Sequence, residues 1–236
     1  MNIALLTAAG SGQRMHQNIP KQFLTVEERP IIVYTMEAFQ KHSNIDVIAV
    51  VCLEGWENIL KAYAEQFNIT KLKHIIPGGK NGQDSIRNGV YELEKHYSKD
   101  DIVLIHDGNR PLVSQDIISD CIATTKKHGC AIPVIPCAEV LVYTTDGDSS
   151  EKCYPRENLK RTQTPHGFPI GKICDLHRRA LEAGITNTAA SVSLMIELGE
   201  KVYFSSGAEK NMKITTVEDI DIFKSLLHVQ RSDWMK

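Results

Sequence analysis

Short runs of valine, isoleucine and leucine alternate along this chain with longer amphipathic runs, and this alternation constrains the fold most strongly. The apolar runs are mostly continuous, as expected for strands that are covered on both faces. They predict strands over Asn2–Thr7, Asp46–Cys52, Lys73–Ile76, Ile102–His106 and Ala131–Ile135. The succession of strand, helix and strand favours an α/β fold with a mainly parallel sheet and helices on both faces. In such folds, ligands bind at the carboxyl ends of the strands.

The amphipathic runs between these strands predict the helices. Pro30 stands at a favourable first-turn position of one helix, and Thr216 with Asp219 forms the pattern of a capping box before the last one. The predicted helices cover Pro30–His42, Gly55–Phe67, Gln83–His96, Ser114–His128, Pro169–Ala183, Ala190–Leu198 and Asp219–Val229.

One segment, Cys137–Thr164, departs from this rhythm. It contains the β-branched run VLVYTT, followed by Asp146-Gly147 and Pro155, which are turn and breaker signals. We expect a protruding β-arm, inserted at about residues 137–162 into a single domain that spans residues 1–236. Such an arm could exchange between subunits.

Composition restricts the partners of the chain. The net charge of -2 supplies no general attraction for nucleic acid or an acidic membrane, so an anionic substrate needs a local cluster of lysine and arginine. The six cysteines form no CxxC pair, and the N-terminus resembles a first strand more than a signal peptide. No run approaches the ~18 apolar residues that a membrane span needs. We therefore expect a cytoplasmic protein with reduced thiols.

The first predicted strand ends in a glycine-containing loop. Gly10 and Gly12 permit tight turns whose N–H groups can surround a phosphate, while Arg14 and Lys21 add positive charge beside them. An ordinary strand-to-helix turn with two solvated charges is the alternative. A dinucleotide-binding fingerprint would need glycine where Met15 stands, and a P-loop would need a GK[ST] sequence that is missing here.

Five motifs, in order, then identify a resemblance. They are AAGSGQRM with PKQFL, GG with DSIRNG over Gly78–Gly89, HDGNRP over His106–Pro111, QTPHGF over Gln163–Phe168 and NMKIT over Asn211–Thr215. Together they resemble the IspD-type cytidylyltransferase family along nearly the whole chain. The resemblance implies a Rossmann-like nucleotidyltransferase fold, a Mg²⁺ requirement and a homodimer clasped by the arm. It also implies transfer of CMP from CTP to a polyol phosphate, with release of pyrophosphate.

The resemblance also implies residue roles. The residues expected to bind CTP are Ala8, Ala9, Gly10, Gly12, Gly79, Lys80, Ser85 and Gly108. Those expected to be catalytic are Arg14, Lys21, Asp107 and Lys213, with Asp107 also as the metal ligand. Those expected to bind the polyol phosphate are Asp107, Arg110, Arg156, Thr164 and Thr188. A phosphate monoester is already ionised, so positioning and charge neutralisation matter more than a general base, and lysine, arginine and Mg²⁺ suit that task.

Several positions depart from the family pattern. Pro136, Cys137, Ala138 and Glu139 replace a DT-I-K-like stretch, and Asn187–Leu194 lacks the two acids of a TDDAS-like helix start. Gly82 stands where the family usually has arginine, and His166 replaces a glutamine. Most of these changes fall on the acceptor side. We therefore expect CTP as the donor, with 2-C-methyl-D-erythritol 4-phosphate of isoprenoid synthesis as the family's default acceptor and D-ribitol 5-phosphate, for cell-surface polymers, as the alternative.

Two other classes remain open from the sequence. A CTP-binding pseudoenzyme would explain the altered acceptor side, although Arg14, Lys21, Asp107 and Lys213 are all present. A nicotinamide-dependent oxidoreductase would share the strand–helix rhythm. It would lack a ribose-binding acid after the second strand other than Glu54.

Overall fold

A five-stranded sheet forms the centre of the computed structural model, which describes residues 1–10 and 19–228. Its strand order is β11-β6-β1-β4-β5; four strands are parallel, and β11 is antiparallel at one edge. The strands are β1 (Asn2–Ala8), β4 (Val47–Cys52), β5 (Leu72–Pro77), β6 (Ile102–Asp107) and β11 (His166–Pro169). The predicted mainly parallel sheet is confirmed.

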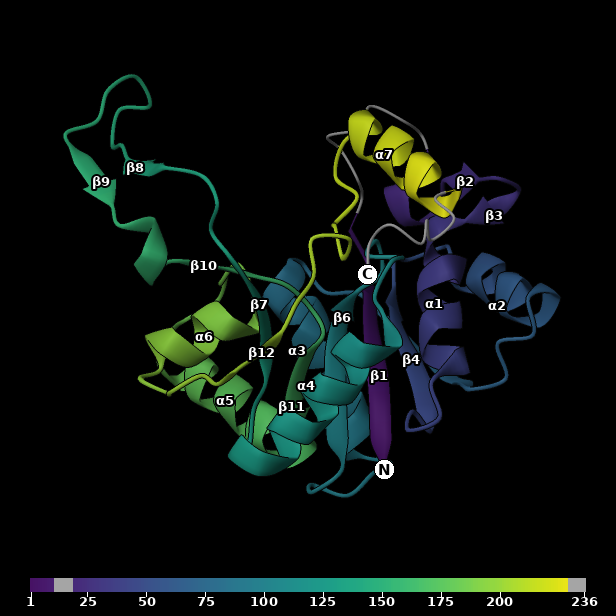
Figure 1. Ribbon diagram of the computed structural model, residues 1–236. Helices are drawn as coiled ribbons and strands as arrows, with labels where there is room; N and C mark the ends of the chain where they lie inside the picture. The colour runs from purple at the N-terminus through teal and green to yellow at the C-terminus, as the bar shows by residue number, and fades with distance from the viewer. Residues whose placement is uncertain (11–18, 229–236) are drawn as a thin grey trace.

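Helices cover both faces of this sheet (Figure 1). On one face lie α1 (Ile31–Lys41), α2 (Glu57–Gln66) and α4 (Gln115–His128). On the other lie α3 (Gly82–Glu94), α5 (Ile170–Glu182) and α6 (Ser191–Glu197). The last helix is α7 (Val217–His228), and its predicted capping box forms: Asp219 N donates to Thr216 Oγ1 at 3.3 Å, and Thr216 N donates to Asp219 Oδ2 at 2.8 Å.

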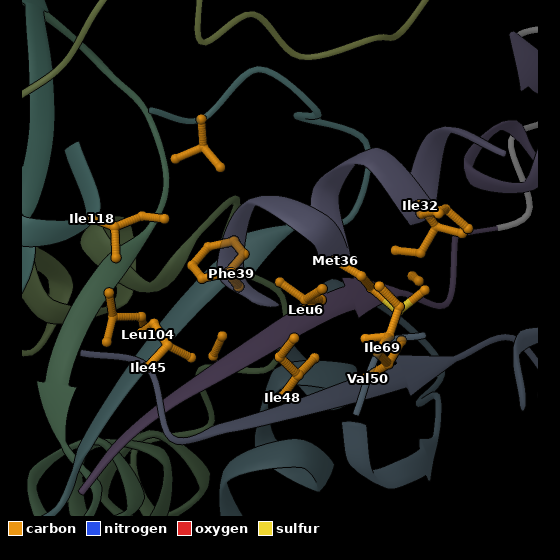
Figure 2. Packing of buried hydrophobic residues seen from close by; sticks show 14 of the residues in the cluster. Leu6, Ile32, Met36, Phe39, Ile45, Ile48, Val50, Ile69, Leu104 and Ile118 are labelled. Atoms are coloured by element: carbon orange, nitrogen blue, oxygen red, sulfur yellow. The ribbon is translucent and has the colours of Figure 1, made fainter. Parts of the chain in front are cut away.

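Alternation along each strand divides the core into two layers. In β1, Ala4 and Leu6 face α1, whereas Ile3 and Leu5 belong to the cluster beneath α3 and α5. Figure 2 shows the first layer, where the side chains of α1 lie over β1 and β4. Both faces of the central strands are thus apolar, which is why their sequences read as continuous hydrophobic runs.

The predicted strand over Ala131–Ile135 forms, as β7 (Ile132–Pro136), but it leaves the main sheet. It pairs antiparallel with β10 (Lys160–Thr162) and parallel with β12 (Phe204–Ser206). Antiparallel β11 takes the position beside β6 instead. Strands β10, β11 and β12 were not predicted, because strands of three or four residues carry too little periodicity in the sequence. A two-stranded ribbon of β2 (Thr25–Val26) and β3 (Arg29–Pro30) precedes α1.

The predicted arm protrudes from the body of the molecule (Figure 1). It carries the hairpin of β8 (Leu141–Tyr143) and β9 (Lys152–Tyr154), followed by the short 3-10 helix η3 (Arg156–Asn158). Consecutive apolar side chains from Val140 to Tyr143 are exposed, between 43% and 69%. A soluble chain rarely presents such a run without a partner surface.

All six cysteines lie within the described residues and are unpaired; five are buried and Cys153 is exposed. Across residues 1–10 and 19–228, no helix combines the length and apolar character needed to cross a membrane.

Replacing Ile48 by alanine tests the importance of the first core layer. Ile48 is fully buried in β4, so Ile48→Ala is expected to lower the free energy of unfolding by about 2–5 kcal/mol, through lost burial and a residual cavity. Denaturant unfolding measures this change. The matched control is Ile59→Ala on α2, where the side chain is 38% exposed and a loss below about 1 kcal/mol is expected. Equal losses would contradict the layered core.

Candidate active site

A cleft of about 520 Å³ opens at the carboxyl ends of the parallel strands. Each of the four parallel strands supplies a wall residue at or just beyond its end: Ala8 at the end of β1, Leu53 after β4, Gly79 after β5 and Asp107 at the end of β6. This is the location that a parallel α/β sheet favours, and the volume falls in the range of small-molecule sites.

A buried amide side chain holds the loop after β1 in place through hydrogen bonds. Gln22 Nε2 donates to Ala8 O at 2.7 Å and to Gly10 O at 3.1 Å, so the first part of the loop has a fixed path. Lys21, in the 3-10 helix η2 (Lys21–Phe23), lies on the cleft wall together with Ala8, Ala9 and Gly10. Gly12 and Arg14 lie outside the described residues, so their predicted roles stay predictions.

The loop after β5 is built around the first turn of α3. Asn81 caps the helix by accepting from Asp84 N at 2.9 Å, and Gly79 N donates to Ser85 Oγ at 3.0 Å. A Cβ at Gly79 would lie 2.6 Å from the backbone carbon of Asp84, so only glycine fits there. Gly79, Lys80 and Ser85, which the resemblance assigns to cytidine binding, all line the cleft.

Asp107 lies between two cations from distant parts of the chain. Its Oδ1 is 2.8 Å from Lys213 Nζ, and its Oδ2 is 2.9 Å from Arg110 Nε. Burial alone would favour the neutral acid, but the charges of Lys213 and Arg110 outweigh it and hold the pKa of Asp107 well below its usual range. The carboxylate is therefore ionised at neutral pH, and it fixes the ammonium group of Lys213 at the cleft.

The cleft residues fit a Mg²⁺ ion that binds together with the phosphates of a substrate. Mg²⁺ takes oxygen ligands and often uses one or two carboxylates together with substrate phosphates. Among the described wall residues of the cleft, Asp107 is the one carboxylate, and no cluster of three or more His, Cys, Asp or Glu in the described residues could hold a metal alone. Phosphate oxygens would have to complete the coordination.

Beneath Asp107, the Thr164 hydroxyl has a defined set of partners. Oγ1 accepts from Asp107 N at 3.1 Å and lies 3.0 Å from His106 Nδ1. His106 Nε2 is 3.1 Å from Arg110 O, which can only accept, so Nε2 carries the ring proton and Thr164 donates to Nδ1. Burial lowers the pKa of His106 to about 4, which keeps the ring neutral. The Thr164 hydroxyl therefore orients Asp107. Because its one proton is donated to His106, it would have to release that bond to contact an acceptor phosphate, and this predicted contact stays a prediction.

The Thr188 hydroxyl is similarly engaged. Gln83 Oε1 accepts from Thr188 N at 2.7 Å and from Thr188 Oγ1 at 3.0 Å, while Gln83 Nε2 donates to Ile185 O at 2.7 Å. Asn81 Nδ2 adds a bond to Thr186 O at 3.1 Å. The first turn of α3 therefore fixes the loop before α6. These hydrogen bonds connect the loop predicted to bind the base, after β5, with the loop predicted to bind the acceptor, before α6.

A second cavity of about 140 Å³ continues from the cleft past Asp107. Arg110, Thr164 and His166 line it, and Ser191 and Lys213 line both cavities. The predicted acceptor side thus has a chamber of its own next to the charged residues. His166, a departure from the family pattern, belongs to this chamber; burial lowers its pKa to about 4.

Some predicted site residues lie elsewhere. Arg156 is on the arm in η3, donates to Ala138 O at 3.3 Å and lines neither cavity. Cys137 and Glu139, at the base of the arm, also line neither. Gly108 lies behind the cleft wall, where its N–H donates to Thr7 O at 2.9 Å and a Cβ would meet Ile32 Cδ1 at 2.8 Å.

Several polar residues that line the site were not predicted from the sequence. Gln22, Gln83 and Ser191 are buried on its walls, and His177 on α5 is 1% exposed there. Polar residues at otherwise apolar helix positions were the available signal, but it does not separate a site residue from a satisfied core residue.

Glycine-containing loops, lysines from opposite ends of the chain and a paired aspartate surround this cleft, and such a set suits the polyphosphate substrate of a nucleotidyltransferase. The family model described as "IspD: 2-C-methyl-D-erythritol 4-phosphate cytidylyltransferase" matches residues 2–228. The chain belongs to this cytidylyltransferase family. The predicted nucleotidyltransferase with a cytidylyltransferase fold is confirmed. The alternative of a nicotinamide-dependent oxidoreductase is therefore rejected.

Named relatives carry two acceptor names. The chain is 38% identical to ribitol-5-phosphate cytidylyltransferase of Lacticaseibacillus paracasei, over 96% of this chain and 98% of the relative. It is 40% identical to the enzyme of that name from Vibrio parahaemolyticus, over 98% of both chains. A 2-C-methyl-D-erythritol 4-phosphate cytidylyltransferase of Clostridium botulinum is 34% identical, over 96% of this chain and 97% of the relative.

Solved structures agree on the fold. The 4-diphosphocytidyl-2C-methyl-D-erythritol synthase of Anaerococcus prevotii superposes with a TM-score of 0.81 at 25% identity, covering 97% of this chain and 96% of the other. The 2-C-methyl-D-erythritol 4-phosphate cytidylyltransferase of Thermus thermophilus superposes with a TM-score of 0.76 at 26% identity, covering 96% and 98%.

Gly79, in the loop after β5, and Gly82, the first residue of α3, provide a matched test of this site. Gly79→Ala should displace the loop from α3 and raise the KM for CTP about tenfold or more, equivalent to about 1.4 kcal/mol of lost binding. Gly82→Ala is the control, because a Cβ there meets no heavy atom within 4 Å, and its KM should stay within about twofold. Steady-state kinetics at varied CTP concentration gives both values. A larger effect at Gly82 would contradict the assigned packing.

Buried histidine predicts acid sensitivity. Burial lowers the pKa of His177 from 6.5 to about 4, and neither ring nitrogen has a hydrogen-bond partner among the described residues. The unfolded state therefore binds more protons between these values, and the stability contributed by neutral His177 is lost as the pH falls through this window. Between pH 7 and pH 5, the free energy of unfolding in urea should fall by about 2 kcal/mol less in His177→Leu than in the wild type. His128→Leu, at an exposed position, is the control, and an unchanged pH dependence of His177→Leu would contradict the prediction.

Proposed function

We propose that this cytidylyltransferase transfers CMP from CTP to D-ribitol 5-phosphate, giving CDP-ribitol and pyrophosphate. The observation that carries the choice of acceptor is the pair of full-length relatives named for ribitol 5-phosphate, at 38% and 40% identity. Relatives named for 2-C-methyl-D-erythritol 4-phosphate, the default acceptor predicted from the sequence, include one at 34% and two at 36% identity. The departures on the acceptor side, such as His166 in the small chamber, support the same choice.

The mechanism follows from charge. A phosphate-monoester oxygen of the acceptor attacks the α-phosphorus of CTP in line, and the bond to the pyrophosphate oxygen breaks. Both reactants are anions, so their approach is favoured by the fixed cations on the cleft wall. Lys21 lies beside the loop after β1 and would neutralise the triphosphate, while Lys213, held by Asp107, would neutralise charge where the two substrates meet.

Magnesium belongs to this proposal. Asp107 would share Mg²⁺ with the phosphate oxygens of CTP, and the ion would neutralise charge that develops on the phosphates. The loop amides around Ala9 and Gly10 would then hold the same phosphates in a fixed orientation.

A homodimer and a cytoplasmic location complete the proposal. Val140 and its apolar neighbours on the arm are exposed in the described part of the chain and would be buried against a second copy, where Arg156 on the same arm would reach the acceptor phosphate. Six unpaired cysteines fit a reducing compartment.

Turnover with two acceptors tests the proposed function. Purified protein with CTP and Mg²⁺ should release pyrophosphate faster with D-ribitol 5-phosphate than with 2-C-methyl-D-erythritol 4-phosphate, measured side by side at equal concentration. The reverse preference would overturn the acceptor and retain the reaction. No release with any polyol phosphate would favour a CTP-binding pseudoenzyme.

Lys21→Ala tests the assigned chemistry. Removing a cation that acts on the transition state should lower kcat by about 10²–10³, with an unchanged far-ultraviolet circular dichroism spectrum. Lys61→Ala, on α2 and away from the cleft wall, is the control and should keep wild-type turnover. Near-normal turnover of Lys21→Ala would refute the role of this lysine.

A further inference from the structure

The segment that carries Lys213 into the cleft is fixed on both sides of this residue. On its C-terminal side, Ile214 is fully buried, and Ile214 N donates to Asn109 O at 2.9 Å. Asn109 Nδ2 returns a bond to Ile214 O. Ile214, which directly follows Lys213, is therefore hydrogen-bonded to the loop after β6.

On its N-terminal side, two buried amide side chains hold the segment through hydrogen bonds. Asn211 is fully buried, and its Nδ2 donates to Thr164 O at 2.8 Å and to Gln163 Oε1 at 3.3 Å. Gln163 is 5% exposed; its Nε2 donates to Ala208 O at 2.8 Å, and its Oε1 accepts from Ala208 N at 3.1 Å. The Gln163 amide thus pairs with the backbone of Ala208 as a neighbouring strand would.

Close packing requires this arrangement. A Cβ at Gly207 would lie 2.7 Å from Gln163 Oε1 and 3.0 Å from Val134 O, so a side chain at position 207 would push the amide away from Ala208. Both ends of the turn from Ala208 to Asn211 are therefore bonded to the QTPHGF motif.

The amide pair also reaches the second cation of Asp107. Asn211 O accepts from Arg110 Nη1 at 2.6 Å, and Arg110 Nε is bound to the Asp107 carboxylate. Asn211 thus lies between the segment of Lys213 and the arginine on the other side of the same carboxylate. Asn211 lines neither cavity, so it acts through other residues, whereas Gln163 also lines the small cavity.

We propose that Gln163 and Asn211 are positioning residues that hold Lys213 against Asp107 for the transfer reaction. Met212 alone separates Asn211 from Lys213, so a shift of the Asn211 anchor moves the Lys213 backbone directly. The Lys213 side chain is 38% exposed and has four rotatable bonds, so its own packing does not fix the ammonium group. This role rests on the proposed function.

Kinetics of Asn211→Ala test the proposal first. The variant keeps the backbone carbonyl that binds Arg110 and loses both side-chain bonds. With D-ribitol 5-phosphate as acceptor, kcat should fall about 10–100-fold while the KM for CTP changes less than about threefold, because misplacing a reacting group by about 1 Å costs up to about 10²-fold.

A double-mutant cycle separates positioning from folding. If Asn211 acts through Lys213, adding Asn211→Ala to Lys213→Ala should lower kcat by less than about twofold further. Gln163→Met, which keeps the length of the side chain, should show the same dependence on Lys213. Equal losses in the two backgrounds would overturn the proposal. Thr125→Val is the control: it removes a buried bond to Cys121 O on α4, so it should lower the melting temperature and leave kcat unchanged.

A structural readout keeps the inference distinct from the proposed function. In crystal structures, Lys213 Nζ should lie within hydrogen-bond distance of Asp107 in the wild type and beyond about 4 Å in Asn211→Ala. An unmoved Lys213 would overturn the positioning role even if wild-type turnover is high. If the wild type transfers CMP to no polyol phosphate, the proposed function fails, and this pair of structures decides the positioning role.

Discussion

The carboxylate of Asp107 is the interaction on which the site depends, because it joins segments that lie far apart in the sequence. Lys213 and Arg110 bind its two oxygens, and Thr164 accepts a hydrogen bond from its backbone N–H. A lone carboxylate at this depth would favour its neutral form; two cations keep it charged. The ionised state of Asp107 and the position of the Lys213 ammonium group therefore depend on each other.

Order in the rest of the cleft comes from buried amides. Gln22 fixes the loop after β1, Gln83 fixes the loop before α6, and Gln163 with Asn211 fixes the segment of Lys213. Each amide bonds to backbone groups, so each holds a loop that has no strand partner of its own. Loops built this way can present amides and lysines to a polyanion without rearranging, which is what a reaction between two anions requires.

Much of this arrangement could be predicted from the sequence. Continuous apolar runs predicted the strands because both faces of the sheet are covered, and the strand ends located Ala8, Gly79 and Asp107 at one edge. The capping box at Thr216 specified the start of α7. What the pattern could not give is the partner of each polar group. A threonine on a cleft wall can bind a phosphate or a neighbour, and only the fold brings Gln83 to Thr188 and His106 to Thr164.

The arm shows the same limit at a larger scale. Its turn signals predicted a protrusion, and the structure has one, but the distance between Arg156 and the cleft could not follow from spacing along the chain. Thr164 and Arg156 are eight positions apart in the sequence, yet Thr164 lines the small cavity beside Asp107 and Arg156 lies on the arm. Arg156 lines neither cavity of its own chain, so a role in acceptor binding requires the arm to change position or to meet the cleft of a second copy. The exposed apolar side chains of Val140–Tyr143 on that arm supply a reason for such a contact, since their burial against a second copy would bring the arginine with them.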